Sequence, residues 1–396
     1  MSTRARSLLA PCLAFLAAAM TSAADLSVER LELLTHGSYS KESGKIEAAT
    51  RLYFDLAMAG GDKFGGILRM DFLNGGIEEA LAENASPLPS DASGPAIVER
   101  INKLLSPRFR MASITAKGML GLPLDVSYFV GSLDDFASGD DFVPLFGTAP
   151  FSTSLRGPMV YPEGVGGDPN LFYEGIHAVN GTGLRLGTSP KLAQGFIGYL
   201  YLYQDSDLGT GSWSGDLRAL LNAPKVKLEA FAGASWASDY GIYRGGLLFF
   251  AAPGDIGEFF MQVGIPYWDP AGSFSVENLY FLFEPRINFG FGNIALTVFY
   301  HPGYYRQRPT NEKSALDTGF NLRFGRLAQQ GAQGGLESLL AFRPYGDEPL
   351  AVDVSPYYSM IAGGVEWDFK VGVRAFPFPD PWYAMFKPFI GLKTSY

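Results

Sequence analysis

The sequence lacks cysteine beyond its first two dozen residues, where Cys12 is the single example. A chain without further thiols has no disulfide framework, no thiolate zinc site and no cysteine nucleophile. Long apolar runs are missing too. Beyond residue 24 no run approaches the roughly 18 to 20 residues that a membrane-spanning helix needs, and Leu247–Ala252 is among the longest. Transmembrane helices are therefore excluded as organising elements.

Histidine is scarce, and catalytic motifs are absent. The three histidines, His36, His177 and His301, are too scattered for an H-E-x-x-H zinc pair. The sequence holds neither a G-x-S-x-G nucleophile elbow nor a phosphate-binding P-loop. A serine–histidine pair in a barrel wall stays open, with His301 at a strand end. We predict no enzyme activity, no catalytic residue, no metal site and no cofactor.

Basic residues are fewer than acidic ones, 31 against 40, which gives a formal net charge of −9. Nucleic acids are polyanions, and proteins that bind them do so through an excess of Lys and Arg on one face. We therefore predict no nucleic-acid partner.

The first 24 residues have the features of a secretory signal peptide. Arg4 and Arg6 form a basic start, Ser7 to Met20 is uncharged and apolar, and Ser22-Ala23-Ala24 is a small-residue cleavage site. A single membrane anchor would need a longer apolar run, and lipoprotein processing at Cys12 would cut the apolar core short. We predict export with cleavage, leaving one domain over residues 25–396.

The rest of the chain contains many short stretches in which apolar and polar residues alternate. In the stretch 365–375, one face carries Val365, Trp367, Phe369, Val371, Val373 and Ala375, and the other carries Glu366, Asp368, Lys370, Gly372 and Arg374. A β-strand places these two sets on opposite faces. With 48 Gly, 31 Phe and 20 Tyr, the pattern predicts an all-β, transmembrane antiparallel up-and-down barrel. A secreted soluble all-β protein is the alternative.

Connection lengths mostly alternate along the chain, as they do in barrels with short turns on one side and long loops on the other. The exceptions are 236–239, which is short, and 326–334, which is long. The pattern predicts 18 strands, with 16 left open. Two long external loops are predicted. Residues 74–107 carry short helices, over Ile77–Glu83 and Ala96–Leu105, and residues 134–175 are rich in Gly and Pro. The last strand ends at Tyr396, and its alternation resembles the signal that the outer-membrane barrel assembly machinery recognises.

Two stretches resemble the general diffusion porins. Residues 162–168, Pro-Glu-Gly-Val-Gly-Gly-Asp, resemble a P-E-x-G-G-D motif of the third loop of those proteins. Residues 185–196, from Arg185 to Phe196, resemble an R-x-x-S-P-x-x-x-G-F segment that spans a periplasmic turn. Each match contains an insertion. The resemblance implies a trimeric, water-filled barrel in which loop 134–175 folds inward, and it makes 74–107 the loop that latches onto a neighbouring subunit, although predicted helices there depart from that pattern.

The resemblance also implies a constriction with acids on the loop facing bases on the wall. The matching acids are Glu163 and Asp168, and the candidate bases on the polar face are Arg51, Arg69, Arg110 and Arg185. Further residues predicted to face the lumen are Lys45, Glu47, Asp55, Asp71, Glu366, Asp368, Lys370 and Arg374. Because both signs are present, we predict modest ion selectivity.

The leading functional prediction is a channel for passive diffusion of small hydrophilic solutes across a bacterial outer membrane, with lipid and the assembly machinery as partners. One alternative is a transporter of hydrophobic compounds through a plugged barrel, its pocket lined by Phe146, Phe151, Phe172 and Tyr173. Another is an adhesin that binds its ligand through loops 74–107 and 134–175.

Overall fold

A computed structural model describes the chain over residues 25–40, 44–75, 106–156, 175–189, 194–208, 211–237, 240–272, 274–302, 304–305, 308–309, 315–327, 331–344 and 348–394. Within these ranges no helix has both the length and the apolar character to cross a membrane. The predicted signal peptide, the helices predicted in loop 74–107, and Tyr396 all lie outside the described residues.

Long strands make up nearly all of the regular structure. The first nine are β1 (Asp25–Tyr39), β2 (Ile46–Gly60), β3 (Phe64–Gly75), β4 (Ser106–Ala116), β5 (Leu124–Phe136), β6 (His177–Thr188), β7 (Phe196–Asp205), β8 (Trp213–Asn222) and β9 (Val226–Ala237). The others are β10 (Tyr240–Ala251), β11 (Gly257–Trp268), β12 (Tyr280–Phe289), β13 (Gly292–His301), β16 (Ala315–Gly325), β17 (Ala332–Phe342), β18 (Leu350–Ala362), β19 (Val365–Phe376) and β20 (Phe386–Thr394).

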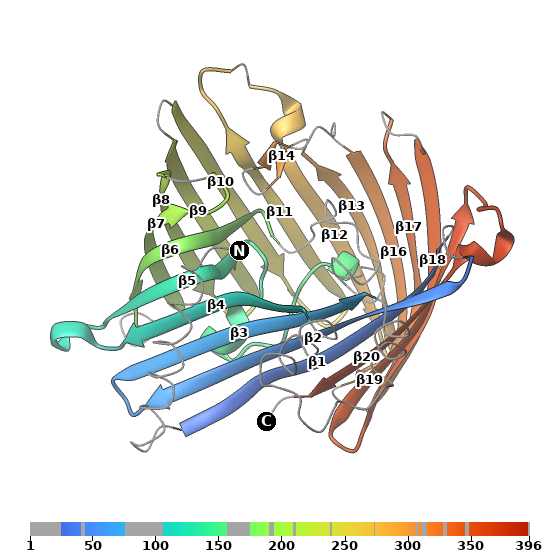
Figure 1. Ribbon diagram of the computed structural model, residues 1–396, viewed down its shortest axis with the longest axis horizontal. Coiled ribbons are helices and arrows are strands. Elements are labelled where there is room, and N and C mark those ends of the chain that lie inside the picture. Colours follow the sequence, from blue (N-terminus) through green and yellow to red (C-terminus); the bar gives the residue numbers. More distant parts are fainter. Residues whose placement is uncertain are drawn as a thin grey trace, which may run out of the picture.

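These strands form one closed antiparallel sheet of 18 strands (Figure 1). Each strand pairs with the strands next to it, and β1 closes the ring on β20 from Leu31 opposite Thr394 to His36 opposite Phe389. Closure leaves the barrel wall with no unpaired strand edge. The predicted fold class and the count of 18 strands are confirmed. The barrel fold that the resemblance to porins implies is confirmed with them. A separate two-residue hairpin, β14 (Tyr304–Tyr305) with β15 (Arg308–Pro309), lies in the β13–β16 connection.

The two ends of the barrel differ in their connections. At one end, which we call the short-turn end, β18 and β19 are joined by Gly363 and Gly364 alone. Both glycines have positive φ, 62° and 78°, the left-handed conformation that a tight two-residue hairpin requires. The opposite, long-loop end holds the β3–β4 and β5–β6 connections. Because the strand number is even, the chain enters β1 and leaves β20 at the short-turn end.

One strand boundary differs from the prediction. β5 continues to Phe136, so Asp134 and Asp135 belong to a strand rather than to the loop predicted from residue 134. A register shift between Ser132 and Asp135 carries the β5–β6 pairing across an irregular point, which hides this extension in the sequence pattern.

Apolar side chains cover the outside of the barrel, and polar side chains point inward. On β8, Leu217 is 61% exposed on the outer face, whereas its neighbours Asp216 and Arg218 are 1% and 2% exposed. On β19, Phe369 and Val371 are exposed, and Lys370 between them is buried. Such an inversion of the soluble pattern is expected where the outer face meets lipid and the inner face meets a polar lumen.

Replacing Leu217 by Arg should therefore lower the free energy of unfolding by about 2–4 kcal/mol, since Leu217 lies near the middle of β8, where a charge would sit deep in lipid. Leu221→Arg, on the same face and one residue before the end of β8, should cost only about 0–1 kcal/mol. Guanidinium titration of the protein refolded in lipid vesicles measures both values. Equal costs at the two positions would contradict the assignment of this face to lipid.

Candidate functional site

Residues 137–156, which we call the lumen segment, leave the end of β5 and lie inside the ring of strands. They contain a short helix, α4 (Phe142–Phe146), and a 3-10 turn, η2 (Ser154–Arg156), which Figure 1 shows within the barrel. Ala137 turns the chain with a left-handed φ of 58°, a conformation that costs a non-glycine residue about 1–2 kcal/mol. Contacts to the wall must therefore hold this turn.

Aromatic packing attaches the lumen segment to the inner faces of β10 and β11, through Phe250 and Phe260. Phe151 stacks on Phe250 with ring centroids 4.7 Å apart, and it also contacts Phe142 at 5.1 Å. Phe136, at the end of β5, packs against Phe231 at 5.2 Å. All of these rings are buried. These inward aromatic residues form an apolar core between the segment and the wall rather than a surface facing water.

A buried carboxylate on β9 fixes the start of the lumen segment. Glu229 is fully buried, and its Oε1 accepts a hydrogen bond from the backbone N–H of Ala137 at 2.5 Å. The same oxygen accepts from Arg218 Nε at 2.7 Å. The side-chain amide of Gln262, on β11, donates to the carbonyl of Ala137. Together these bonds satisfy both backbone polar groups of the strained turn.

A second buried carboxylate, on β12, fixes the end of the segment. Glu284 accepts hydrogen bonds from Thr153 Oγ1 at 2.7 Å and from the backbone N–H of Ser154 at 2.9 Å. On the wall side it accepts from Thr297 Oγ1 at 2.6 Å and from Arg286 Nε at 2.7 Å. Bonds to an ionised acceptor are worth more than neutral ones, about 1.5–3 kcal/mol each. Glu229 and Glu284 thus act as two clamps, one at each end of the segment.

The lumen segment also packs closely against β16, where Leu155 lies over Gly319. A side chain on Gly319 would place its Cβ 2.6 Å from Leu155 Cδ2, so this buried leucine would have to shift. The lumen segment therefore spans the inner wall from β8, through Arg218, to β16.

Buried ion pairs lie beneath the first part of the segment. Arg218, on β8, is fully buried and binds both Glu229 and Asp141 of the lumen segment. Next to it, Arg244 of β10 binds Asp216 of β8 at 2.7 Å. Asp216 also accepts from Tyr203 Oη at 3.0 Å, and His177 Nε2 is 3.6 Å away. Removing one member of such a network leaves a buried charge unpaired, which costs about 3–5 kcal/mol.

The predicted bases occupy the inner wall, but most have local carboxylate partners. Arg185 binds Asp134 at 2.9 Å, and Tyr201 Oη donates to the same carboxylate at 2.8 Å. Arg51 binds Asp71 through Nε at 2.9 Å, and Arg69 lies 3.7 Å from Asp55. The guanidinium of Arg110 lies over the ring of Tyr53, 5.5 Å from its centroid.

The remaining residues predicted to face the lumen are divided between two places. Asp368 accepts a hydrogen bond from Ser359, and Arg374 binds Asp353 at 2.7 Å, both on the inner side of β18 and β19. Lys370 lies over Phe389 at 4.7 Å, and Glu366 is half-buried near the short-turn end. Lys45 instead lies in the β1–β2 loop, one residue before β2, and Glu47 is exposed at the start of that strand.

The acids expected at the constriction, Glu163 and Asp168, lie outside the described residues, as do Phe172 and Tyr173. The structure reveals anchoring residues that the sequence did not single out, chiefly Glu284, Arg218 and Gln262. One signal was available. β10 is apolar on both faces, at Leu247, Leu248, Phe249 and Phe250, as strands covered on both sides are.

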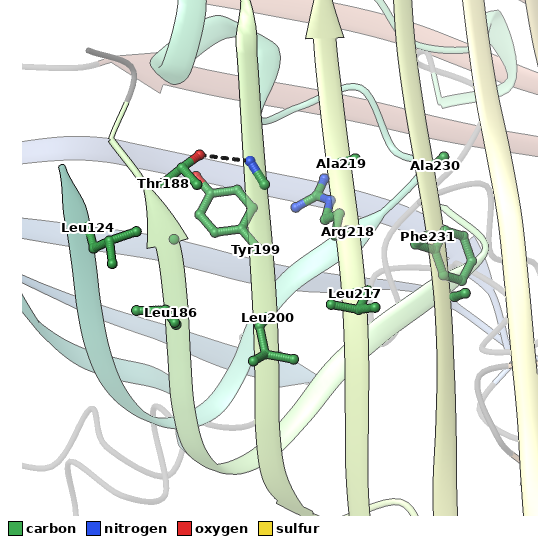
Figure 2. A pocket seen from close by; sticks show the side chains of 13 residues that line it. Leu124, Leu186, Thr188, Tyr199, Leu200, Leu217, Arg218, Ala219, Ala230 and Phe231 are labelled. Carbon is green, nitrogen blue, oxygen red and sulfur yellow. Dashed lines mark hydrogen bonds between the residues drawn. The ribbon is translucent and has the colours of Figure 1, made fainter. Parts of the chain in front are cut away.

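A recess of about 530 Å³ is lined by residues of β5 to β9, outward-facing leucines and alanines together with Arg218 and Phe231. Leu186, Leu200 and Leu217 border it in Figure 2, and Ala219 and Ala230, on β8 and β9, also line it and contribute little bulk. Thr188 Oγ1 accepts from the backbone N–H of Gly198 at 2.9 Å at its edge. Its exposed leucines belong to the apolar outer face, whereas Arg218 binds Asp141 of the lumen segment.

No protein-family model and no curated protein matches the sequence. Among solved structures, two engineered variants of the porin of Rhodopseudomonas blastica align with 94% of this chain and 100% of their own, at 10% identity and TM-scores of 0.47 and 0.46. A triple variant of that porin aligns at 12% identity with a TM-score of 0.42. Likeness at this level is too weak to support an assignment, and the fold rests on the strand pairing of this chain.

Replacing Glu284 by Gln should release the end of the lumen segment and lower the free energy of unfolding by about 3–5 kcal/mol, because Arg286 loses its buried partner. Hydrogen exchange at the Ser154 and Leu155 amides should accelerate. Glu258→Gln is the matched control, since Glu258 lies on neighbouring β11, is partly exposed and binds Arg286 only at 3.5 Å. Its cost should stay below about 1 kcal/mol. Similar effects of the two substitutions would argue against the clamp.

The attachment of the segment should also depend on pH. Burial raises the pKa of Asp141 to about 6, with the Arg218 cation opposing the shift and the nearby Asp134 and Glu229 carboxylates adding to it. A released, hydrated segment would return this pKa to about 4. Protonation therefore favours the attached form, and stability from this group rises as the pH falls from about 7 through 6. Hydrogen exchange over residues 137–146 should slow on acidification.

Asp141→Asn should remove most of this pH dependence. Asp140→Asn provides a comparison that deletes an adjacent, exposed charge, the partner of Arg156 at 2.8 Å, and should leave the pH dependence in place. Retention of the full pH dependence in the Asp141 variant would assign it to another group.

Proposed function

We propose that the protein is an outer-membrane channel for passive diffusion of small hydrophilic solutes, with the lumen segment narrowing its pore. The proposal rests on a difference between two parts of the inner wall, one covered by the lumen segment and one lined by charged side chains. The segment is anchored to β8–β13 and β16, whereas charged side chains line β1–β4 and β17–β20. A polar, charged lumen beside a fixed constriction is how barrel channels admit hydrated solutes and set ion preference.

The alternative of a transporter for hydrophobic compounds has less support. Phe151 is fully packed against Phe142 and Phe250, and Phe146 contacts Phe142 at 5.5 Å. These contacts hold the segment on the wall and use most of the surface of Phe151, while Phe146 stays half-buried. We find no described feature that favours an adhesin over a channel.

Several parts of the proposal rest on sequence alone. These are cleavage of residues 1–24, the placing of Glu163 and Asp168 at the constriction, assembly as a homotrimer, and recognition of the last strand, which ends at Tyr396, by the barrel assembly machinery. The alternating outward residues of β20, Phe386, Ile390 and Leu392, agree with the last of these.

The test is single-channel recording in planar bilayers. We expect steady ohmic openings. Because the only cysteine is Cys12, Asp140→Cys places a single thiol on the exposed part of the lumen segment, and its modification by a bulky thiol reagent should cut the conductance severalfold. Leu217→Cys, on the outer face, is the matched control and should not respond. The proposal would be contradicted by a protein that inserts and never conducts. Equal responses of the Asp140→Cys and Leu217→Cys variants to the reagent would contradict it as well.

A further inference from the structure

We propose that Arg30 and Arg110, held around Tyr53 on the inner wall of β1–β4, form a binding site for the oxyanion group of a small anionic solute, a carboxylate or a phosphate. The inference rests on the proposed channel function for its meaning, because the site would give the pore a preferred class of solute.

Three guanidinium groups surround one aromatic ring. The Cζ atoms of Arg30, Arg51 and Arg110 lie 4.2, 4.8 and 5.5 Å from the centroid of Tyr53. Any two of them are thus at most about 10 Å apart, no farther than the Debye length of roughly 10 Å at 0.1 M salt, so salt screens their repulsion only in part. The ring offsets part of this cost through cation–π attraction. An anion between the guanidinium groups would offset more.

Carboxylates in this part of the wall do not balance the arginines. Arg30 binds Glu32 through Nε at 2.7 Å, Arg51 binds Asp71, and Arg69 lies near Asp55. Arg108 faces the lumen because it is directly opposite Asp71 in the β3–β4 register. Within the described residues no carboxylate forms an ion pair with Arg108 or Arg110. With Glu47, which shares the inner face of β2 with Arg51, this wall carries four acids against five arginines, so a small excess of positive charge remains.

A bulge in β4 aims Arg110 at the ring. In the β3–β4 register Met111 lies opposite Arg69 and Phe109 opposite Met70, so Arg110 is the extra residue. Gly131 of β5 permits this geometry. It has φ of 97°, and a Cβ there would lie 2.1 Å from the carbonyl oxygen of Arg110. Bulges re-aim side chains beside functional sites, and here the bulge directs an unpaired guanidinium inward.

The chemistry of the guanidinium groups indicates which class of ligand the site would bind. Guanidinium forks bind planar carboxylates and phosphates through paired, charge-assisted hydrogen bonds. The side chain of Arg30 remains 36% exposed and Arg110 is half-buried, so both can reach a solute. Tyr53 and Arg51 are buried and serve as the platform.

Calorimetry on the full barrel in detergent tests binding without reference to transport. Sodium malonate and sodium phosphate, titrated separately at constant ionic strength, separate a carboxylate site from a phosphate site. We expect saturable binding of at least one anion. Arg110→Gln should weaken it about tenfold or more, as expected for the loss of a charge-assisted bond. Arg374→Gln is the matched control, because Arg374 faces the lumen but is already paired with Asp353 and Glu348.

Arg30→Gln, on a different strand, repeats the test should the bulge not tolerate Arg110→Gln. Absence of saturable binding for both anions, or equal weakening in the Arg110 and Arg374 variants, would overturn the inference. Bilayer recording with the same anions then separates the two proposals. Conductance without anion binding leaves the channel standing and removes the site, whereas anion binding by a barrel that never conducts removes the channel.

Discussion

Ring closure is the constraint on which the rest of the structure depends. Once β1 pairs with β20, every strand must send alternate side chains into a shared interior. Those side chains need water, a partner or other protein atoms, because a buried polar group without any of these costs free energy. The barrel uses different solutions on different sides. Beneath the lumen segment, charges are paired and rings are packed. On β1–β4, buried pairs such as Arg51 with Asp71 lie beside partly exposed arginines.

The lumen segment shows how polar anchors and apolar packing divide the task of holding an irregular chain. Phe142 and Phe151 supply contact area with the wall, but apolar contact does not fix a register. Glu229 and Glu284 do so, because each binds particular backbone N–H groups of the segment. Without those acceptors the turn at Ala137 and the chain at Ser154 would bury unsatisfied donors. The carboxylates therefore determine where the segment lies, and the aromatic rings contribute to keeping it there.

The sequence predicted the wall well and its interior poorly. Alternation in residues such as Val365 to Ala375 specifies which face is polar, so class and strand number could be derived. It does not specify whether an inward residue meets water or protein. Phe250 and Glu284 obey the same period, yet their role depends on a segment more than 90 residues away in the sequence. Short-range patterns carry no information on such contacts. One indication came from β10, which is apolar on both faces, whereas a strand that faces a water-filled lumen has polar residues on its inner face.

The long reach of the clamp at Glu284 has a consequence for assembly. Ser154 and Glu284 are 130 residues apart, and contacts of such high sequence separation form late because the intervening chain must first be ordered. The segment emerges between β5 and β6 but finds its final acceptors on β12 and β13, and its last packing partner on β16. It must already lie on the concave side when those strands join. The interior is therefore filled as the wall is built, and the order of strand addition becomes part of how the pore acquires its shape.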